Sequence, residues 1–216
     1  EKIVYNTLTV PVRERFQLVL ADGTKVFLNS GSEMRYPERF GKARREVFLK
    51  GEAWFEVAKD SAREFWVHAG AMDVKVLGTS FNVKAYERLE TVATTLVEGS
   101  VEVACAGKSF QIVPGEQFVY DKNNRVMDVR MVDTESYVSW KDGYYEFEEM
   151  ELGELMPLLG RWYAVGVDFE EPELKRLKFS GRLQRYETVA DLVKMLEYTG
   201  DVVFEVKNDR ILVRKR

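Results

Sequence analysis

Hydrophobic and polar residues alternate in short runs from Arg15 to about Val132, and turn residues separate the runs. Alternation with a period of two is typical of half-buried β-strands. Residues 16–20 and 26–28 each place hydrophobic side chains on one face, and Asp22-Gly23 between them suits a tight hairpin turn. Strand-like runs recur about every ten residues, as in sandwiches, jelly rolls and barrels. We therefore predict a mainly β N-terminal domain over residues 1–132, an antiparallel sandwich or jelly-roll-like fold.

A second hairpin is predicted around Gly107. Val101, Val103 and Cys105 fall on one face of its first strand, and Phe110 lies on the returning strand. Because the apolar face of such a strand packs into the core, we expect Cys105 to be buried and unreactive. Cys105 is also the only cysteine of the chain, so an intramolecular disulfide is impossible.

The pattern changes in residues 133–143, a polar stretch that we predict to be a linker. After it, strands and helices follow in the order βαβ, βαβ and a last strand, a weak repeat with a period of roughly 35 residues. The predicted strands are residues 144–147, 165–169, 178–183, 202–206 and 211–213. We therefore predict a small α/β C-terminal domain of two βαβ units over residues 144–216, with helices on one sheet face and an edge open for pairing.

Two amphipathic helices are expected in this domain. Residues 152–159 carry leucine and methionine at helical spacing, although Pro157 predicts a kink or a late start. Thr188 with Asp191 three residues later resembles a capping box, and Gly200 suits the C-terminal cap of the second helix.

Composition excludes several classes of function. The 32 basic and 36 acidic residues are mixed along the chain and give a net charge of -4, so nucleic acid is not an expected partner. His68 is the only histidine, which excludes a multi-histidine metal site, and no pattern predicts a cofactor. No run approaches the roughly 18 apolar residues of a membrane span, and the first six residues lack the apolar region of a signal peptide.

Catalytic patterns are weak. A Ser-His-Asp triad would have to use His68, but residues 65–68 have the pattern of a strand and no Gly-x-Ser-x-Gly elbow occurs, so a histidine at a surface or sheet edge is favoured. Glu52 and Glu56 share a strand face about 13 Å apart, which is wider than either geometry of glycoside hydrolysis. We therefore expect no enzyme, and a β-sandwich hydrolase is the least favoured hypothesis.

Four tryptophans suggest carbohydrate binding as an alternative function. Trp54, Trp66, Trp140 and Trp162 are candidates for a platform on which sugar rings stack, although tryptophans more often pack in cores or between domains. An exported carbohydrate-binding β-sandwich module therefore stays open as the second hypothesis.

Ordered motif blocks resemble the periplasmic region of FecR-type sigma-factor regulators. The blocks are residues 20–32 (LADGTKVFLNSGS) with 35–37 (RYP), 45–57 (REVFLKGEAWFEV), 76–83 (VLGTSFNV), 95–101 (TLVEGSV) and 114–117 (PGEQ). Residues 140–143, 161–163 and 179–181 resemble the domain that follows FecR in many members, which is similar to the short modules of secretins and TonB-dependent receptors. Nearly the whole chain is covered by this resemblance.

The resemblance implies a transmembrane anti-sigma factor. Its N-terminal cytoplasmic segment would hold a sigma factor, one membrane helix would precede Glu1, and the present residues would lie in the periplasm, tethered to the inner membrane. The signalling domain of a TonB-dependent outer-membrane receptor would be the partner.

Some family members cleave themselves at a Gly-Thr bond in the motif that Gly78-Thr79 matches. This chemistry needs a strained amide and a base near the threonine hydroxyl. We favour an intact structural turn at Gly78-Thr79.

The C-terminal domain is expected to carry the receptor-binding surface, because an open strand edge can extend the sheet of a partner. Acidic residues 146–154 and basic residues 175–185 would give this domain a charge asymmetry that steers the partner. The candidate partner-binding residues are Lys178, Phe179, Ser180, Gly181, Arg182, Leu183, Ile211, Leu212 and Val213.

Overall fold

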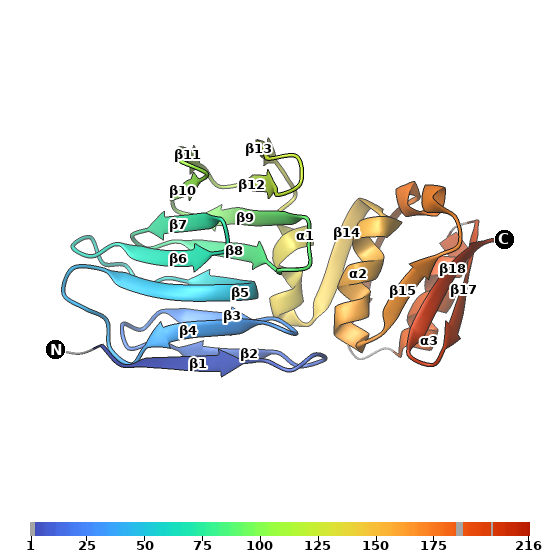
Figure 1. The fold of residues 1–216 in the computed structure, drawn as a ribbon, viewed down its shortest axis with the longest axis horizontal. Helices are drawn as coiled ribbons and strands as arrows, with labels where there is room; N and C mark the ends of the chain where they lie inside the picture. The colour runs from blue at the N-terminus through green and yellow to red at the C-terminus, as the bar shows by residue number, and fades with distance from the viewer. Residues whose placement is uncertain (1–2, 185–187, 200) are drawn as a thin grey trace. The chain divides into compact units, whose positions relative to one another are not determined.

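The computed structural model describes residues 3–184, 188–199 and 201–216 (Figure 1). The chain divides into two compact units, Glu1–Val138 and Ser139–Arg216. The division falls within residues 133–143, where the chain forms the α-helix α1 (Glu135–Val138) and the 3-10 helix η1 (Ser139–Asp142). The limits of the two domains as folding units stay a prediction, which limited proteolysis of this segment tests.

The first unit consists of β-strands followed by α1, and the predicted mainly β fold is confirmed. Its strands are β1 (Tyr5–Thr9), β2 (Phe16–Val19), β3 (Lys25–Leu28), β4 (Glu33–Pro37), β5 (Arg45–Glu56), β6 (Phe65–Ala69), β7 (Met72–Val76), β8 (Ser80–Ala85), β9 (Thr91–Glu98), β10 (Val101–Cys105), β11 (Lys108–Ile112), β12 (Glu116–Asp121) and β13 (Val126–Met131). The predicted hairpin at Asp22-Gly23 joins β2 to β3. Gly23 takes a positive φ of 88° in that turn, a conformation that glycine adopts without strain.

The long strand β5 belongs to two sheets. Its first half pairs with β4 and β6 in sheet A, ordered β1-β4-β5-β6-β7-β10-β11. Its second half pairs with β3 and β8 in sheet B, ordered β2-β3-β5-β8-β9-β12-β13. Gly51 lies at the junction with a φ of 109°, and a Cβ there would lie 2.7 Å from the Cα of Ser32. Only glycine therefore fits where one strand passes between the sheets.

The core lies between the inner faces of the two sheets. The ring of Phe55 on sheet B lies 6.1 Å from that of Phe65 on sheet A, and the Phe110 ring of sheet A lies 5.1 Å from the Phe118 ring of sheet B. Buried aliphatic side chains from most strands fill the space around these rings. The unit is therefore a β-sandwich, as the alternating pattern predicts. It is not wholly antiparallel as expected, because β5 pairs with β6 in parallel.

Cys105 lies in this core and is 2% exposed, so the prediction that it is buried is confirmed. Burial raises the pKa of its thiol, and the negative charge of Asp73 raises it further. Because the thiolate is the reactive form, we expect the native protein to react with a maleimide at neutral pH at least about 100-fold more slowly than the unfolded chain. Rapid labelling in native buffer would contradict this expectation.

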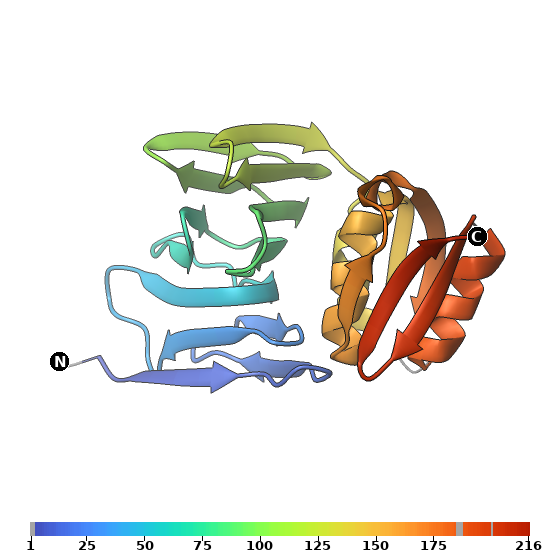
Figure 2. The ribbon, with the colours of Figure 1, turned by 45° about the vertical axis from the view of Figure 1, so that its right-hand side comes forward.

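The second unit contains the predicted strands and helices in the predicted order. They are β14 (Tyr144–Glu151), α2 (Leu152–Tyr163), β15 (Gly166–Phe169), the 3-10 helix η2 (Pro172–Arg176), β16 (Lys178–Gln184), α3 (Val189–Thr199), β17 (Val202–Lys207) and β18 (Arg210–Lys215). The strands form two sheets rather than one: β14 pairs with β16, and β15-β18-β17 form the other sheet. Helix α2 contacts β14 and β15, and α3 contacts β16 and β17, so each helix packs on both sheets (Figure 2).

Helix α2 is buried on more than one side, so a single sheet cannot cover it. Leu155 and Met156 of the predicted stripe are buried, but so are Leu158 and Trp162 outside it. A helix that is apolar on more than one side needs cover on more than one side. The helix also begins at Leu152 with Pro157 inside it, so a late start near Pro157 is wrong, whereas the alternative of a kink stays a prediction.

Helix α3 begins as predicted, because the backbone N–H of Asp191 donates to the Thr188 hydroxyl at 3.2 Å. The Thr188 hydroxyl in turn donates to the Asp191 carboxylate and holds the pKa of that group below its usual value. Gly200, the predicted C-terminal cap, lies outside the described residues. Within the part of the chain that the structure describes, no helix is both long and apolar enough to cross a membrane.

Candidate functional site

The Gly78-Thr79 bond lies between β7 and β8, in a segment whose backbone is tightly held. The carbonyl of Leu77 accepts a hydrogen bond from the N–H of Asp60 at 3.0 Å. The carbonyl of Thr79 accepts one from the N–H of Val57, also at 3.0 Å. A Cβ on Gly78 would lie 2.9 Å from the Cα of Lys59, so glycine is needed here for close packing. The segment is therefore fixed against the chain that follows β5.

The Thr79 hydroxyl is engaged by a carbonyl rather than a base. Thr79 is 5% exposed, and its Oγ1 donates to the carbonyl oxygen of Ser100 at 3.1 Å. Gly99 packs against it so closely that a Cβ there would lie 2.8 Å from Thr79 Oγ1. Attack on the preceding carbonyl needs a base that takes the hydroxyl proton. Among the described residues, no carboxylate or imidazole is hydrogen-bonded to this hydroxyl.

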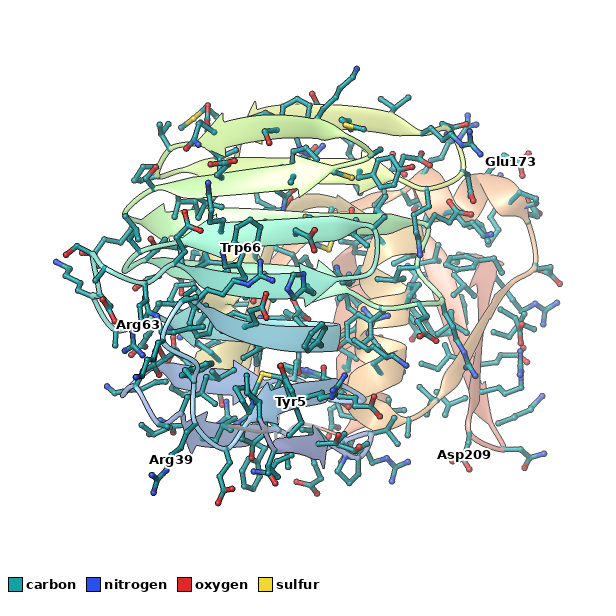
Figure 3. All side chains as sticks on the ribbon, turned by 60° about the vertical axis from the view of Figure 1, so that its left-hand side comes forward. Tyr5, Arg39, Arg63, Trp66, Glu173 and Asp209 are labelled. Carbon is teal, nitrogen blue, oxygen red and sulfur yellow. The ribbon has the colours of Figure 1, made fainter. Side chains whose placement is uncertain are left out.

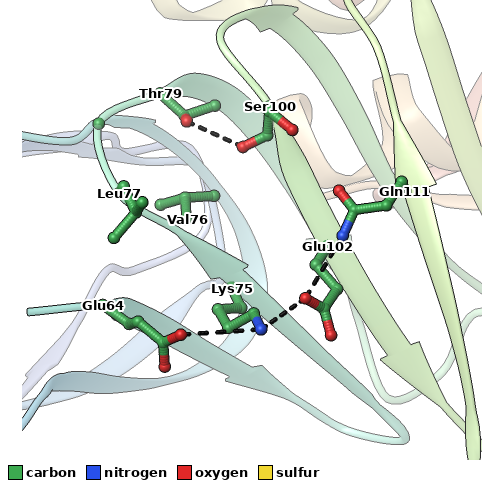
Figure 4. A pocket seen from close by; sticks show the side chains of 9 residues that line it. Glu64, Lys75, Val76, Leu77, Thr79, Ser100, Glu102 and Gln111 are labelled. Atoms are coloured by element: carbon green, nitrogen blue, oxygen red, sulfur yellow. Dashed lines mark hydrogen bonds and ion pairs between the residues drawn. The ribbon is translucent and has the colours of Figure 1, made fainter. Parts of the chain in front are cut away.

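Two carboxylates line a pocket of about 320 Å³ beside this segment (Figure 4). Lys75 lies between them, with its Nζ 3.7 Å from Glu64 and 2.5 Å from Glu102. Gln111 donates a further hydrogen bond to Glu102. The hydrogen bond to Glu102 raises the pKa of Lys75. The carboxylates are thus engaged with the ammonium group of Lys75, an arrangement that favours a surface ion-pair network over acid–base chemistry at Thr79.

We accordingly expect the purified chain to remain intact at Gly78-Thr79, because the Thr79 hydroxyl has no base among its described hydrogen-bond partners and hydrogen bonds hold the neighbouring backbone in place. Intact-mass spectrometry over several days checks this expectation, with Thr79→Ala as the control. Two fragments, of which the second begins at Thr79 and which Thr79→Ala abolishes, would establish self-cleavage.

A fully buried arginine lies beside the segment that carries Gly78. The side chain of Arg45 is 0% exposed, and its Nη1 lies 2.8 Å from the carboxylate of Asp22. Its guanidinium also donates to the carbonyl oxygens of Ala58, Arg63 and Leu77. One side chain therefore ties the β2-β3 turn to the loop before β6 and to the segment that carries Gly78. Arg45 is the first residue of the motif block 45–57, and no sequence pattern marks it as buried.

A second buried polar group is Glu52. Its carboxylate accepts hydrogen bonds from the side-chain amides of Asn29, at 2.8 Å, and Asn82, at 3.0 Å. Glu56, which shares its strand, instead accepts from the indole N–H of Trp54. The two glutamates thus have separate partners, and Glu52 has a structural role, because it ties β5 to β8 and to the residue that follows β3.

His68 lies on the solvent side of sheet A, as predicted for a surface strand histidine, and its side chain is 26% exposed. Its Nδ1 lies 2.7 Å from the carboxylate of Asp73. Its ring stacks on Phe48, at 4.9 Å between centroids, and on Trp66, at 6.2 Å. The ammonium of Lys75 lies 5.7 Å from the centre of the Trp66 ring. Figure 3 shows Trp66 on this face.

This row of rings is not a sugar platform. The rings stack on one another, which leaves their faces covered by neighbouring side chains. Trp54, Trp140 and Trp162 are buried, with exposed fractions of 4%, 1% and 4%. The described tryptophans therefore form no flat exposed platform, and the carbohydrate-binding alternative loses the feature that suggested it.

The two predicted partner strands of the second unit differ in their surroundings. β16, which holds Lys178, Phe179, Ser180, Gly181, Arg182 and Leu183, pairs with β14 alone, and no other described strand covers its second edge. β18, which holds Ile211, Leu212 and Val213, lies at the centre of its sheet and pairs with β15 on one side and β17 on the other. The prediction that residues 211–213 offer an open edge is therefore wrong, because both edges already carry ladder hydrogen bonds.

Comparisons with known proteins match parts of both units. The family model described as "FecR protein" matches residues 6–102, and the model described as "FecR, C-terminal" matches residues 144–213. The chain belongs to the FecR family.

Solved structures similar to this FecR chain cover both units. Two crystal structures, at 1.65 and 2.50 Å resolution, are each described as "a putative anti-sigma factor from Parabacteroides distasonis ATCC 8503". The first is 29% identical with a TM-score of 0.90 and covers 98% of this chain and 99% of its own. The second is 29% identical with a TM-score of 0.89 and covers 99% and 100%. No curated protein matches the chain.

The motif blocks of this FecR chain meet in the two buried networks. Asp22, Arg45 and Leu77 come from three different blocks and meet at the Arg45 guanidinium. Asn29, Glu52 and Asn82 come from the same three blocks and meet at the Glu52 carboxylate. These motif residues therefore act in the fold of the FecR domain, and they provide no reactive group at its surface.

Opposite charges face each other in the FecR C-terminal domain. The ammonium of Lys178 lies 3.6 Å from the carboxylate of Glu149. Arg182 lies opposite Glu146 in the β14-β16 register, and its guanidinium lies 3.8 Å from the centre of the Tyr144 ring. Acidic β14 and basic β16 thus lie side by side in one sheet. Steering of a partner by these charges stays a prediction, and Arg185 of the basic group lies outside the described residues.

Proposed function

We propose that this chain is the periplasmic signal-relay region of a transmembrane anti-sigma factor. It senses a TonB-dependent outer-membrane receptor and controls a cytoplasmic sigma factor, and an N-terminal membrane helix tethers it to the inner membrane. The match to both FecR models in their order carries the proposal. A solved structure described as "a putative anti-sigma factor", similar along 98% of the chain, supports it.

The arrangement of polar residues favours a binding role over an enzymatic one. The carboxylates beside Thr79 are paired with Lys75, and those of Asp22 and Glu52 are enclosed by hydrogen bonds. Within the described ranges, no group of three or more acidic, histidine or cysteine side chains is placed to hold a metal ion. The chain relays a signal through contacts with partner proteins.

The receptor's signalling domain binds the second unit along β16. This strand has an open edge, and Lys178, Ser180 and Arg182 are exposed while Phe179 and Leu183 are buried. A strand from the partner adds to such an edge through main-chain hydrogen bonds, and the exposed alternate side chains give specificity. Residues 140–143, 161–163 and 179–181 resemble a domain that is similar to the short modules of such receptors, and this resemblance implies pairing of similar folds.

The proposal is tested with the full-length protein in cells that carry a reporter for the cognate sigma factor. Arg182→Glu reverses a charge on β16, and Lys207→Glu makes the same change on β17. We expect Arg182→Glu to reduce ligand-induced reporter activity by about tenfold, which corresponds to a contact of about 1.4 kcal/mol. Lys207→Glu should leave it unchanged. Ligand-induced reporter activity that does not change when this entire region is deleted would contradict the proposed function.

A further inference from the structure

The sandwich of the first unit is more open at one end than at the other, although Leu8 of β1 and Leu18 of β2 pack against the core at the more open end. At the less open end, Phe110 of β11 packs on Phe118 of β12 across the two sheets. At the more open end, β1 and β2 are the last strands of sheets A and B and lie together at the lower end of the unit in Figures 1 and 2. Phe16 of β2 faces the core side, since its register partner is the fully buried Leu28, yet it is 51% exposed.

The two open strands lack the features that normally keep strand edges apart. Neither β1 (YNTLT) nor β2 (FQLV) contains a charged residue or proline. The strands at the other end do contain charges: Lys108 in β11, and Asp128 and Arg130 in β13. Val12, which lies between β1 and β2, is 53% exposed, and Val19 at the end of β2 is 63% exposed. Uncharged edges are templates for pairing with another strand, and charges on an edge oppose it.

We propose that this end of the FecR domain pairs with the same end of a second copy of the chain. A partner that pairs with both β1 and β2 has to offer two unpaired strands, one for each sheet. These two strands have to lie about 10 Å apart, the distance between the packed sheets of a sandwich. A single extended peptide covers only one edge. A second copy related by a two-fold axis perpendicular to the sheets presents β1 to β1 and β2 to β2, both antiparallel. Both sheets then continue across the dimer.

The contacts at this end favour self-association over an oppositely charged partner. Because β1 and β2 carry no charge, main-chain hydrogen bonds and apolar burial hold the pair. Phe16 from each copy becomes covered on the core side of β2, and Val19 becomes covered on the outer face of the same strand. Strands of four and five residues make a small interface, and interfaces at the low end of the size range belong to weak, transient associations. This inference is independent of the proposed function.

The test is sedimentation equilibrium of the present chain over about 5 to 500 µM, a range suited to a weak, transient association. We expect the average mass to rise from 25.0 kDa toward twice that value. Val19→Lys places a charge on the outer face of β2 and should keep the chain monomeric at all these concentrations. Val126→Lys is the matched control, since Val126 is an outer-face valine of the edge strand β13 with 56% exposure, and it should dimerise like the unchanged chain.

Hydrogen exchange supplies a readout that needs no variant. The amides of β1 and β2 should exchange more slowly at the high concentration than at the low one, while those of β11 and β13 should not change. A chain that stays monomeric throughout overturns the proposal. Dimerisation of Val19→Lys with the affinity of the unchanged chain, or loss of the dimer in Val126→Lys, overturns it as well.

Discussion

Replacing Arg45 by methionine lowers the free energy of unfolding of the first unit by about 3–5 kcal/mol, the usual cost of removing one partner of a buried ion pair. Methionine fills much of the space but donates no hydrogen bond. The carboxylate of Asp22 then stays buried without its cation, and the carbonyls of Ala58 and Arg63 lose the donor that the guanidinium supplies. Each buried acceptor that is left unsatisfied adds to the loss.

The neighbouring residue provides the matched control. Arg44 also pairs with a carboxylate, that of Glu46 at 2.6 Å, but its side chain is 57% exposed. Exposed ion pairs contribute about 0–1 kcal/mol, so Arg44→Met should be nearly neutral. Thermal unfolding followed by circular dichroism should show a fall in the melting temperature of about 10–20 °C for Arg45→Met only. Equal small effects of both substitutions would show that the buried network does not hold the domain together.

The second large effect is expected at Gly51. Alanine there takes a φ of 109° and places its Cβ 2.7 Å from the Cα of Ser32, where backbone has to move. Strain of this kind costs about 1–3 kcal/mol and overpacking about as much again, so we expect Gly51→Ala to destabilise the unit by about 2–5 kcal/mol.

Gly70 separates backbone strain from lack of space. It also has a positive φ, of 64°, but nothing lies within 4 Å of a Cβ built there. Gly70→Ala should therefore cost about 1 kcal/mol, the price of the left-handed conformation alone. Urea titrations of both variants give the two free energies. A cost for Gly51→Ala no larger than for Gly70→Ala would mean that β5 passes between the sheets without needing glycine.

Local patterns predicted local structure well. Alternation of hydrophobic and polar residues on either side of Asp22-Gly23 predicted the β2-β3 hairpin. The position of Cys105 on the same strand face as Val101 predicted that the cysteine is buried. Such patterns depend only on which side chains share a face. They contain no information about a strand that joins two sheets, and so the double pairing of β5 had no signal apart from Gly51.

Long-range relations explain the predictions that failed and the residues that were missed. Alternation in residues 211–213 identifies a strand but does not distinguish a central strand from an edge, and β18 is central. Arg45 was missed because a charged residue at the start of a strand is usually exposed. Its partner Asp22 lies 23 residues away, and only the fold brings the two together.

The binding of the receptor's signalling domain tests the account most directly. The experiment is isothermal titration of that domain into the present chain, into Arg182→Glu and into Lys207→Glu. It compares the effect on binding of a substitution on β16 with that of a substitution elsewhere in the second unit. We expect one-to-one binding that Arg182→Glu weakens by about tenfold or more and that Lys207→Glu leaves unchanged. Absence of binding to the unchanged chain, or equal binding by all three proteins, would contradict the assignment of β16 as the recognition strand.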